Sequence, residues 1–197
     1  MKKLLLTGLI LWLLWTICFR ESAARWATRP APRDPTQSEQ ALPVAFTRDD
    51  YTIKPLARYT VTAVVLSRAR YHSDEAAKLA PVDLALGWGP MSDAATINAL
   101  EIGQSGRWYH YQWSSEPPIP PAQIARHSAN THCVPANATI RRQLLDIKRH
   151  DLVSLDGYLV EITRPNGWHW RSSLTRDDTE GGSCELLWVT QVSRRAP

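Results

Sequence analysis

The sequence predicts an α+β domain of mostly antiparallel strands, forming a small barrel-like or sandwich domain with two or three short helices. Tyr59 to Leu66 alternates side chains along a run rich in β-branched residues, as strands do. The last third also has strand character, and Asn166-Gly167 is a typical hairpin turn. A strongly bent strand, a hairpin and an intervening helix suit a small barrel, so an OB-like barrel is one arrangement that we expect.

Residues 1–24 precede this domain and have the pattern of a targeting segment. Lys2 and Lys3 are followed by an apolar run, Leu4 to Phe19, which is slightly shorter than the minimum of roughly 17 residues that a membrane-spanning helix needs. The segment is therefore a signal peptide, cut near Ser22-Ala23-Ala24, or an N-terminal transmembrane anchor; a lipoprotein at Cys18 is a third alternative. In each case the N-terminus is expected in the cytoplasm and the remainder outside.

Residues 25–43 are predicted to be a Pro-rich linker, and residues 44–197 a single exported domain. Pro30, Pro32, Pro35 and Pro43 stand among polar residues, with little to bury. Such a segment favours the polyproline II conformation and spaces a domain from the membrane.

The elements expected in the domain follow from periodicity and from capping residues. Ser73, Ser92 and Asn137 are candidate N-caps, Pro121 suits a first helical turn, and Gly157 marks a bulge or sharp bend. In chain order we expect a strand at Arg58–Arg70, a helix at Ser73–Leu79, a strand at Val82–Leu86, a helix at Ser92–Leu100, an aromatic strand at Arg107–Trp113, helices at Pro121–Ser128 and Ala138–Lys148, and strands at Asp151–Thr163, Gly167–Leu174 and Cys184–Val192.

The charge of the domain argues against a nucleic-acid partner. The chain has 23 basic and 19 acidic residues, and removal of Lys2, Lys3, Arg20 and Glu21 leaves 20 and 18, a net charge of only +2. A nucleic-acid binder concentrates its basic residues in a patch, and here they are interleaved with acids.

Cys133 and Cys184 are expected to form a disulfide. An even number of cysteines in an exported domain favours pairing. A cysteine nucleophile and a Cys/His metal site are the alternatives. The metal alternative rests on His127 and His132, with Cys133 beside them and His110 or His169 to complete the site. The simpler interpretation is that these histidines hydrogen-bond the loop backbone, and we expect no metal or cofactor.

Aromatic residues are the candidate binding residues. Period two places Trp108 and His110 on one strand face and Tyr109, Tyr111 and Trp113 on the other. Tryptophan also fills cores, so these rings serve either a surface platform or the interior. The candidates are Trp88, Trp108, Tyr109, Tyr111, Trp113, Trp168, Trp170 and Arg171.

Four stretches of the chain look like an uncharacterised family of exported or membrane-anchored bacterial proteins. They are Val82 to Asp93 (VDLALGWGPMSD), His127 to Asn130 (HSAN), Ser172 to Asp178 (SSLTRDD) and Cys184 to Leu186 (CEL). The resemblance implies a bacterial cell envelope and assigns no activity and no functional residue. The domain is accordingly expected in the periplasm, anchored in the inner membrane, or as a soluble periplasmic or secreted protein after signal cleavage.

These features together predict a non-enzymatic binding or assembly domain displayed outside the inner membrane, with a protein or glycan partner. Standard enzyme signatures such as G-x-S-x-G, H-E-x-x-H and the P-loop do not occur in the sequence. The alternative is a periplasmic hydrolase or metal-dependent enzyme that uses the segment His127 to Cys133.

Overall fold

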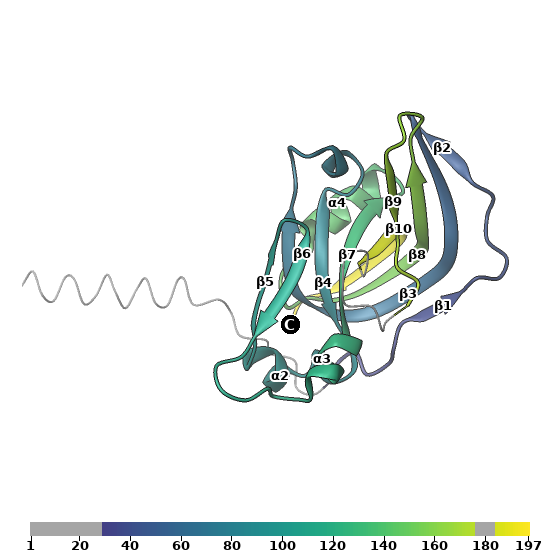
Figure 1. The fold of residues 1–197 in the computed structure, drawn as a ribbon. Coiled ribbons are helices and arrows are strands. Elements are labelled where there is room, and N and C mark those ends of the chain that lie inside the picture. The colour runs from purple at the N-terminus through teal and green to yellow at the C-terminus, as the bar shows by residue number, and fades with distance from the viewer. Residues whose placement is uncertain (1–28, 176–183) are drawn as a thin grey trace, which may run out of the picture.

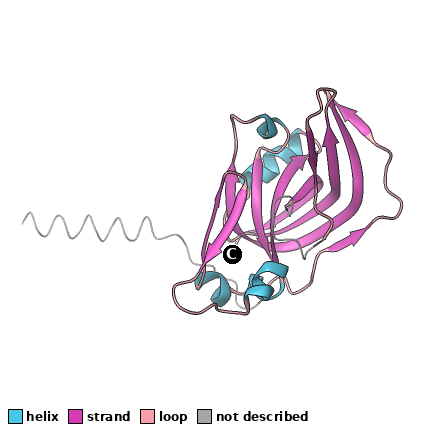
Figure 2. Cartoon of the chain, in the orientation of Figure 1, coloured by secondary structure: helices cyan, strands magenta, loops and turns pink. Residues whose placement is uncertain are grey.

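The computed structural model describes residues 29–175 and 184–197, and its mixture of strands and short helices confirms the predicted α+β class (Figures 1 and 2). The strands are β1 (Thr36–Ser38), β2 (Phe46–Arg48), β3 (Tyr51–Arg70), β4 (Val82–Gly87), β5 (Glu101–Ser105), β6 (Trp108–Gln112), β7 (Ser128–Pro135), β8 (Leu152–Thr163), β9 (His169–Arg171) and β10 (Glu185–Arg195). The helices are η1 (Glu75–Lys78), η2 (Gly89–Ser92), α2 (Ala94–Asn98), α3 (Pro121–Arg126) and α4 (Ala138–Asp146).

Residues 1–24, predicted to be a signal or anchor, lie outside the described residues. Among the helices of the described ranges, none has the length and apolar content that crossing a bilayer requires.

Five strands close into a barrel. Their order is β3-β4-β7-β10-β8, and β3 pairs with β8 to complete the ring. All neighbours are antiparallel except β7 and β10, which are parallel. Numbered along the chain, the barrel strands follow each other as one, two, three, five and four, which is the connectivity of an OB-type barrel.

Strand β3 bends far enough to serve both of its barrel neighbours. Residues 52–64 pair with β8 and residues 64–70 with β4 (Figure 1). Its register shifts between Pro55 and Ala57 and again between Val65 and Ser67, and such irregularities bend a strand. The strand predicted at Arg58–Arg70 is confirmed, and it begins earlier, at Tyr51.

The barrel interior is apolar, and α4 closes one end of it. Ile140, Leu144 and Ile147 are buried against the main core cluster, and burial of such a side chain contributes about 1.5–3 kcal/mol. The helix begins as predicted. The side-chain oxygen of Asn137 accepts hydrogen bonds from the backbone N–H groups of Thr139 and Ile140, at 2.9 and 3.0 Å.

A long insertion between β4 and β7 covers the outside of the barrel. It contains the β5–β6 hairpin, which packs with α2 and α3 over a second apolar cluster that includes Leu66 and Ala85. The hairpin turns at Gly106 and Arg107, whose φ angles are 56° and 68°. The aromatic strand is confirmed as β6. Gly103 lies within β5, and Gly106 lies in the turn.

Two local expectations are corrected. The segment Ser128–Pro135, expected as an irregular loop, is the barrel strand β7. Gly157 pairs with β3 in regular register. The nearest register shift lies in the pairing of β8 with β10, on β10, between Val189 and Gln191. Glycine is required at position 157 because a Cβ atom would lie 1.9 Å from the carbonyl oxygen of Trp188.

The first part of the predicted linker that the structure describes, Arg29 to Ser38, contacts the domain. The backbone of Ala31 is buried and accepts a hydrogen bond of 2.7 Å from the N–H of Gly89, and Arg29 pairs with Asp93 at 3.2 Å. β1 then pairs with β3. The prolines do not hold this segment away from the domain, because its backbone finds partners on the barrel surface.

Candidate functional site

A groove lies on the outer side of β7, where loops from three parts of the chain meet. Its volume is about 380 Å³, within the range of small-ligand sites. We call it the tryptophan groove, and its lining residues are Ala76, Arg107, Trp108, His132, Trp168, His169, Trp170, Arg171 and Cys184. They come from the β3–β4 connection, the β5–β6 turn, β7 and the β8–β10 connection.

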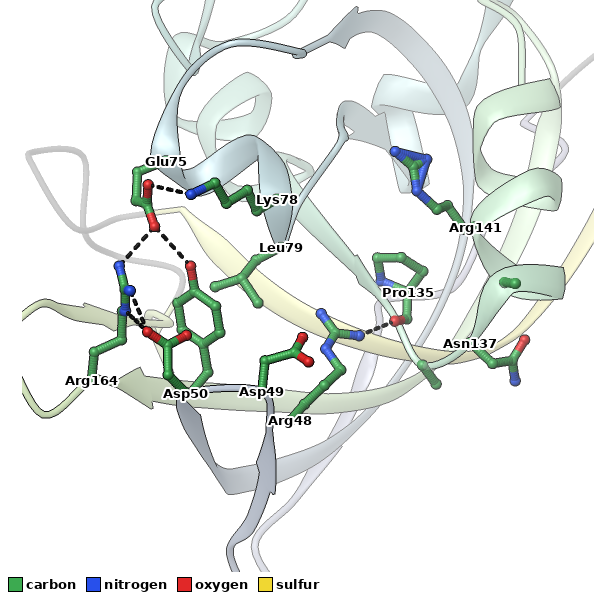
Figure 3. A pocket seen from close by; sticks show the side chains of 13 residues that line it. Arg48, Asp49, Asp50, Glu75, Lys78, Leu79, Pro135, Asn137, Arg141 and Arg164 are labelled. Carbon is green, nitrogen blue, oxygen red and sulfur yellow. Dashed lines mark hydrogen bonds and ion pairs between the residues drawn. The ribbon is translucent and has the colours of Figure 1, made fainter.

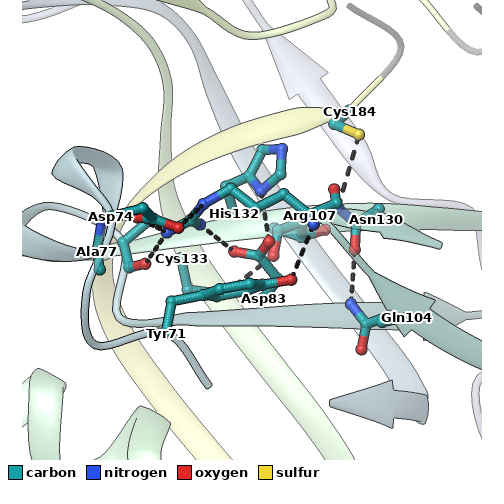
Figure 4. Close-up of polar contacts among 12 residues, drawn as sticks. Tyr71, Asp74, Ala77, Asp83, Gln104, Arg107, Asn130, His132, Cys133 and Cys184 are labelled. Atoms are coloured by element: carbon teal, nitrogen blue, oxygen red, sulfur yellow. Dashed lines mark hydrogen bonds and ion pairs between the residues drawn. The ribbon is translucent and has the colours of Figure 1, made fainter. Parts of the chain in front are cut away.

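The floor of the groove contains a buried histidine and a buried aspartate. Asp83 on β4 and His132 on β7 are register partners, and both point outward because their neighbours in each strand face the core. Nδ1 of His132 lies 2.9 Å from Oδ2 of Asp83, although the contact is poorly aligned as a hydrogen bond. Figure 4 shows the other ring nitrogen, Nε2, pointing away from Asp83. The carboxylate therefore lies against Nδ1 and leaves Nε2 on the other side of the ring.

Arg107 joins this floor to the surrounding loops. Its Nη1 donates to Asp83 at 3.1 Å, and its Nη2 donates to Asp74 at 2.8 Å and to the carbonyl of Ala80 at 3.2 Å (Figure 4). The guanidinium also lies over the ring of Tyr71, 4.0 Å from its centroid. The hydrogen bond from Arg107 is the main cause that lowers the pKa of Asp74, whereas burial raises the pKa of Tyr71. Arg107 is thus a clamp within the protein, with its charge balanced by two carboxylates.

Tryptophan rings form the walls of the groove. The ring of Trp170 lies 4.8 Å from that of His132 and 5.5 Å from the guanidinium carbon of Arg107. Trp168 packs edge-on against Trp170 at 6.0 Å. Trp108, beside the turn, is 50% exposed, and only Val44 accompanies it among the exposed large apolar side chains of the described residues. An exposed indole beside two half-buried ones is a surface on which a flat ligand can stack.

The rim of the groove is polar and close to electrically balanced. Glu161 of β8 accepts from His169 at 2.8 Å and pairs with Arg171 at 3.1 Å. The hydrogen bond from His169, with the positive charge of Arg171, lowers the pKa of Glu161. Both arginines of the groove therefore have carboxylate partners.

Cys133 and Cys184 do not form the predicted disulfide. Cys133 is completely buried in the barrel core, and burial raises the pKa of its thiol well above the ordinary value. Cys184 is partly exposed and lines the groove, on the outer side of the same wall, where Asn130 donates to its sulfur at 3.6 Å. The two thiols therefore lie on opposite faces of the barrel wall.

The eight candidate binding residues separate into two groups. Trp108, Trp168, Trp170 and Arg171 meet in the tryptophan groove. The others pack inside the protein. Trp88 is 1% exposed, and Tyr109, Tyr111 and Trp113 pack against the cluster beneath the insertion, as the period-two pattern allowed. Burial strongly raises the pKa of Tyr109. Trp88 is therefore buried, and the other three rings, although partly exposed, lie outside the tryptophan groove.

The segment His127 to Cys133 does not converge on one site. Nδ1 of His127, at the end of α3, donates to the carbonyl of Gln123, and its Nε2 lies 3.8 Å from Asp34, whereas His132 faces Asp83. Across the described residues, no three His, Cys, Asp or Glu side chains are grouped so as to hold a metal ion. Of this segment, only His132 reaches the tryptophan groove.

A larger cavity, of about 510 Å³, lies beside η1 and the start of α4 (Figure 3). Its charged groups largely bind one another. Glu75 accepts from Tyr51 at 3.0 Å and from Arg164 at 2.7 Å, and Arg164 also pairs with Asp50. Arg48 donates to the carbonyl of Pro135 at 2.7 Å. These groups tie loops together, so the tryptophan groove is the better candidate site.

Asp83, Arg107 and Asn130 are site residues that sequence reasoning did not select. Asp83 offered a signal, because a charged residue stands between Val82 and Leu84 in an apolar strand. Arg107 and Asn130 offered none, since both depend on how the insertion folds back over β7.

Comparison with known proteins supplies no relative: no protein-family model, no curated protein and no solved structure matches this chain.

Proposed function

We propose that this chain is a non-enzymatic binding domain of the bacterial cell envelope, held outside the inner membrane, and that the tryptophan groove binds a glycan. The observation that carries the proposal is the position of the groove. OB-type barrels bind oligonucleotides and oligosaccharides on the face of their second and third strands, between the loops that follow strands one and four. In this chain those elements are β4, β7 and the connections containing η1 and β9, and they surround the groove. The groove shares with those binding faces its position in the fold.

The chemistry of the groove favours a neutral, flat and polar ligand. Indole rings stack on the apolar faces of sugar rings, and donors and acceptors at the rim can bind hydroxyl groups. A polyanion such as a nucleic acid needs unpaired cations for counterion release. Here Arg107 is paired with Asp74 and Asp83, and Arg171 is paired with Glu161. A glycan therefore fits better than a nucleic acid.

Titration with N-acetylglucosamine oligomers, followed by intrinsic tryptophan fluorescence, tests the proposal. We expect saturable binding that Trp108→Ala weakens about tenfold or more, which corresponds to about 1.4 kcal/mol of binding free energy. Val44→Ala is the matched control, because Val44 is also exposed, at 85%, and lies outside the groove. Both replaced side chains are exposed, so neither variant is expected to unfold the domain.

Three results would count against the glycan. Absence of binding by any oligomer, or binding that Trp108→Ala leaves unchanged, contradicts it. Saturable binding of a short peptide in place of the sugars points to a protein partner instead.

A further inference from the structure

Cys184 is a nucleophilic group that glycan binding does not use. It lines the tryptophan groove and is partly exposed, whereas Cys133 is fully buried with a raised pKa. Buried thiols of this kind are inert, and reactive ones are accessible and stand near groups that stabilise the thiolate. The two cysteines therefore differ in accessibility within one protein.

The amide of Asn130 is held so that it donates to the sulfur of Cys184. Its oxygen accepts from Gln104 at 2.7 Å, and its nitrogen donates to the carbonyl of Arg107 at 2.9 Å (Figure 4). The nitrogen's second N–H is left for the sulfur, at 3.6 Å. A donor fixed in this way favours the thiolate over the thiol, because hydrogen bonds to a charged form stabilise it.

His132 is an imidazole on the same groove wall. It is two residues beyond Asn130 on the outer face of β7, is only 5% exposed, and lines the groove with Cys184. Within the described residues, Nε2 has no hydrogen-bond partner, while Nδ1 faces Asp83. Figure 4 shows the ring and the sulfur on the same side of the strand. A buried imidazole with its second nitrogen open toward a groove is available for proton transfer.

We propose that Cys184 is a site of thiol–disulfide exchange, with His132 as its base and Asp83 and Asn130 as positioning residues. His132 takes the proton of Cys184, and the thiolate attacks one sulfur of a disulfide R–S–S–R. A new S–S bond to Cys184 forms as the old S–S bond breaks, and the leaving thiolate takes the proton back from His132. One disulfide is thus converted into a protein mixed disulfide and one thiol.

The adduct has a consequence for binding. Because Cys184 lies in the wall of the groove, a bound thiol fills space that a ligand of the groove needs. This consequence rests on the proposed binding function, whereas the exchange itself does not. The two proposals can therefore fail independently. If Cys184 is inert and the groove still binds a glycan, only the exchange proposal is wrong; if Cys184 reacts and no glycan binds, only the binding proposal is wrong.

The test is modification of the full-length protein by glutathione disulfide at pH 7, mapped by peptide mass spectrometry. We expect Cys184 to react about tenfold faster in the native protein than in the same chain unfolded in denaturant. Cys133 should react only after unfolding, and Cys133→Ala should leave the reaction of Cys184 unchanged. Cys184→Ser should abolish the adduct in the native domain.

The role of His132 is tested with His132→Gln and with pH. The variant should lose the rate advantage at pH 7 and regain the wild-type rate near pH 9, where thiols ionise without a base. Should this variant fail to fold, the pH–rate profile of the unmodified protein decides, since a thiol served by His132 reacts well below pH 8. A native rate no faster than the unfolded rate overturns the proposal. A Cys133–Cys184 disulfide in protein taken from intact cells also overturns it.

Discussion

Replacement of Asp83 by alanine tests whether the buried carboxylate holds the site together. Asp83 has no exposed surface, and it faces Arg107 at 3.1 Å and His132 at 2.9 Å. Removal of one partner from a buried ion pair costs about 3–5 kcal/mol, and here Arg107 would lose its buried carboxylate and keep only Asp74 on the surface. For a domain of this size, 1 kcal/mol corresponds to about 2–4 °C in Tm. We therefore expect Asp83→Ala to lower Tm by roughly 6–20 °C.

Asp74 provides a matched control, because it binds the same arginine from the surface. Its side chain is 45% exposed, and it accepts from Arg107 at 2.8 Å. Surface ion pairs contribute about 0–1 kcal/mol, so Asp74→Ala should lower Tm by no more than a few degrees. Urea unfolding monitored by tryptophan fluorescence gives both free energies of unfolding. Equal losses of unfolding free energy in the two variants would refute this expectation, because burial would then make no difference to how much an ion pair with Arg107 stabilises the fold.

Three further predictions concern the fold. Gly157→Ala should destabilise the domain severely, and more than Gly106→Ala does. A Cβ atom at Gly157 would lie 1.9 Å from a backbone oxygen, whereas a Cβ atom at Gly106 would have no atom within 4 Å. Thermal unfolding of both variants checks this difference. Asn137→Ala should cost about 1 kcal/mol through loss of the α4 cap, measured by urea unfolding, and no loss would contradict the capping role. Burial raises the pKa of Cys133, so as pH rises this thiol ionises in the unfolded chain before it does so in the folded protein. The free energy of unfolding should therefore fall by up to about 1.4 kcal/mol per pH unit above about pH 8.5. Cys133→Ala should flatten that dependence, measured by urea unfolding between about pH 8 and 9.5.

Local pattern was enough to predict most elements of the fold. The long strand β3, the hairpin turn at Asn166-Gly167 and the cap of α4 each follow from a few neighbouring residues, and all are present. Strand β7 was missed because its outward residues, Ser128, Asn130 and His132, are polar. The insertion that precedes these residues in the chain covers them, so they are buried although they are polar. A polar run covered by distant residues cannot be distinguished from a loop by its own composition.

The aromatic residues show the same limit. The period-two pattern correctly separated the faces of β6, but it could not say which face meets the barrel. The structure turns Tyr109, Tyr111 and Trp113 onto the barrel, and Trp108 outward toward the groove. That choice depends on how the hairpin folds over Ala85 and Leu66. Sequence alone therefore predicts which side chains share a strand face, whereas tertiary packing decides what that face contacts.

The disulfide prediction failed for a reason that becomes clear once β7 is known to be a strand. Adjacent strand residues face opposite sides, so His132 in the groove requires Cys133 to lie in the core. β10 runs parallel to β7 with Leu187 opposite Cys133, so Cys184 is three residues away, roughly 10 Å along the strand. Disulfides need Cα atoms within about 7 Å. The register that brings Cys184 beside Asn130 thus separates it from Cys133, and the thiol expected to staple the fold belongs instead to the site.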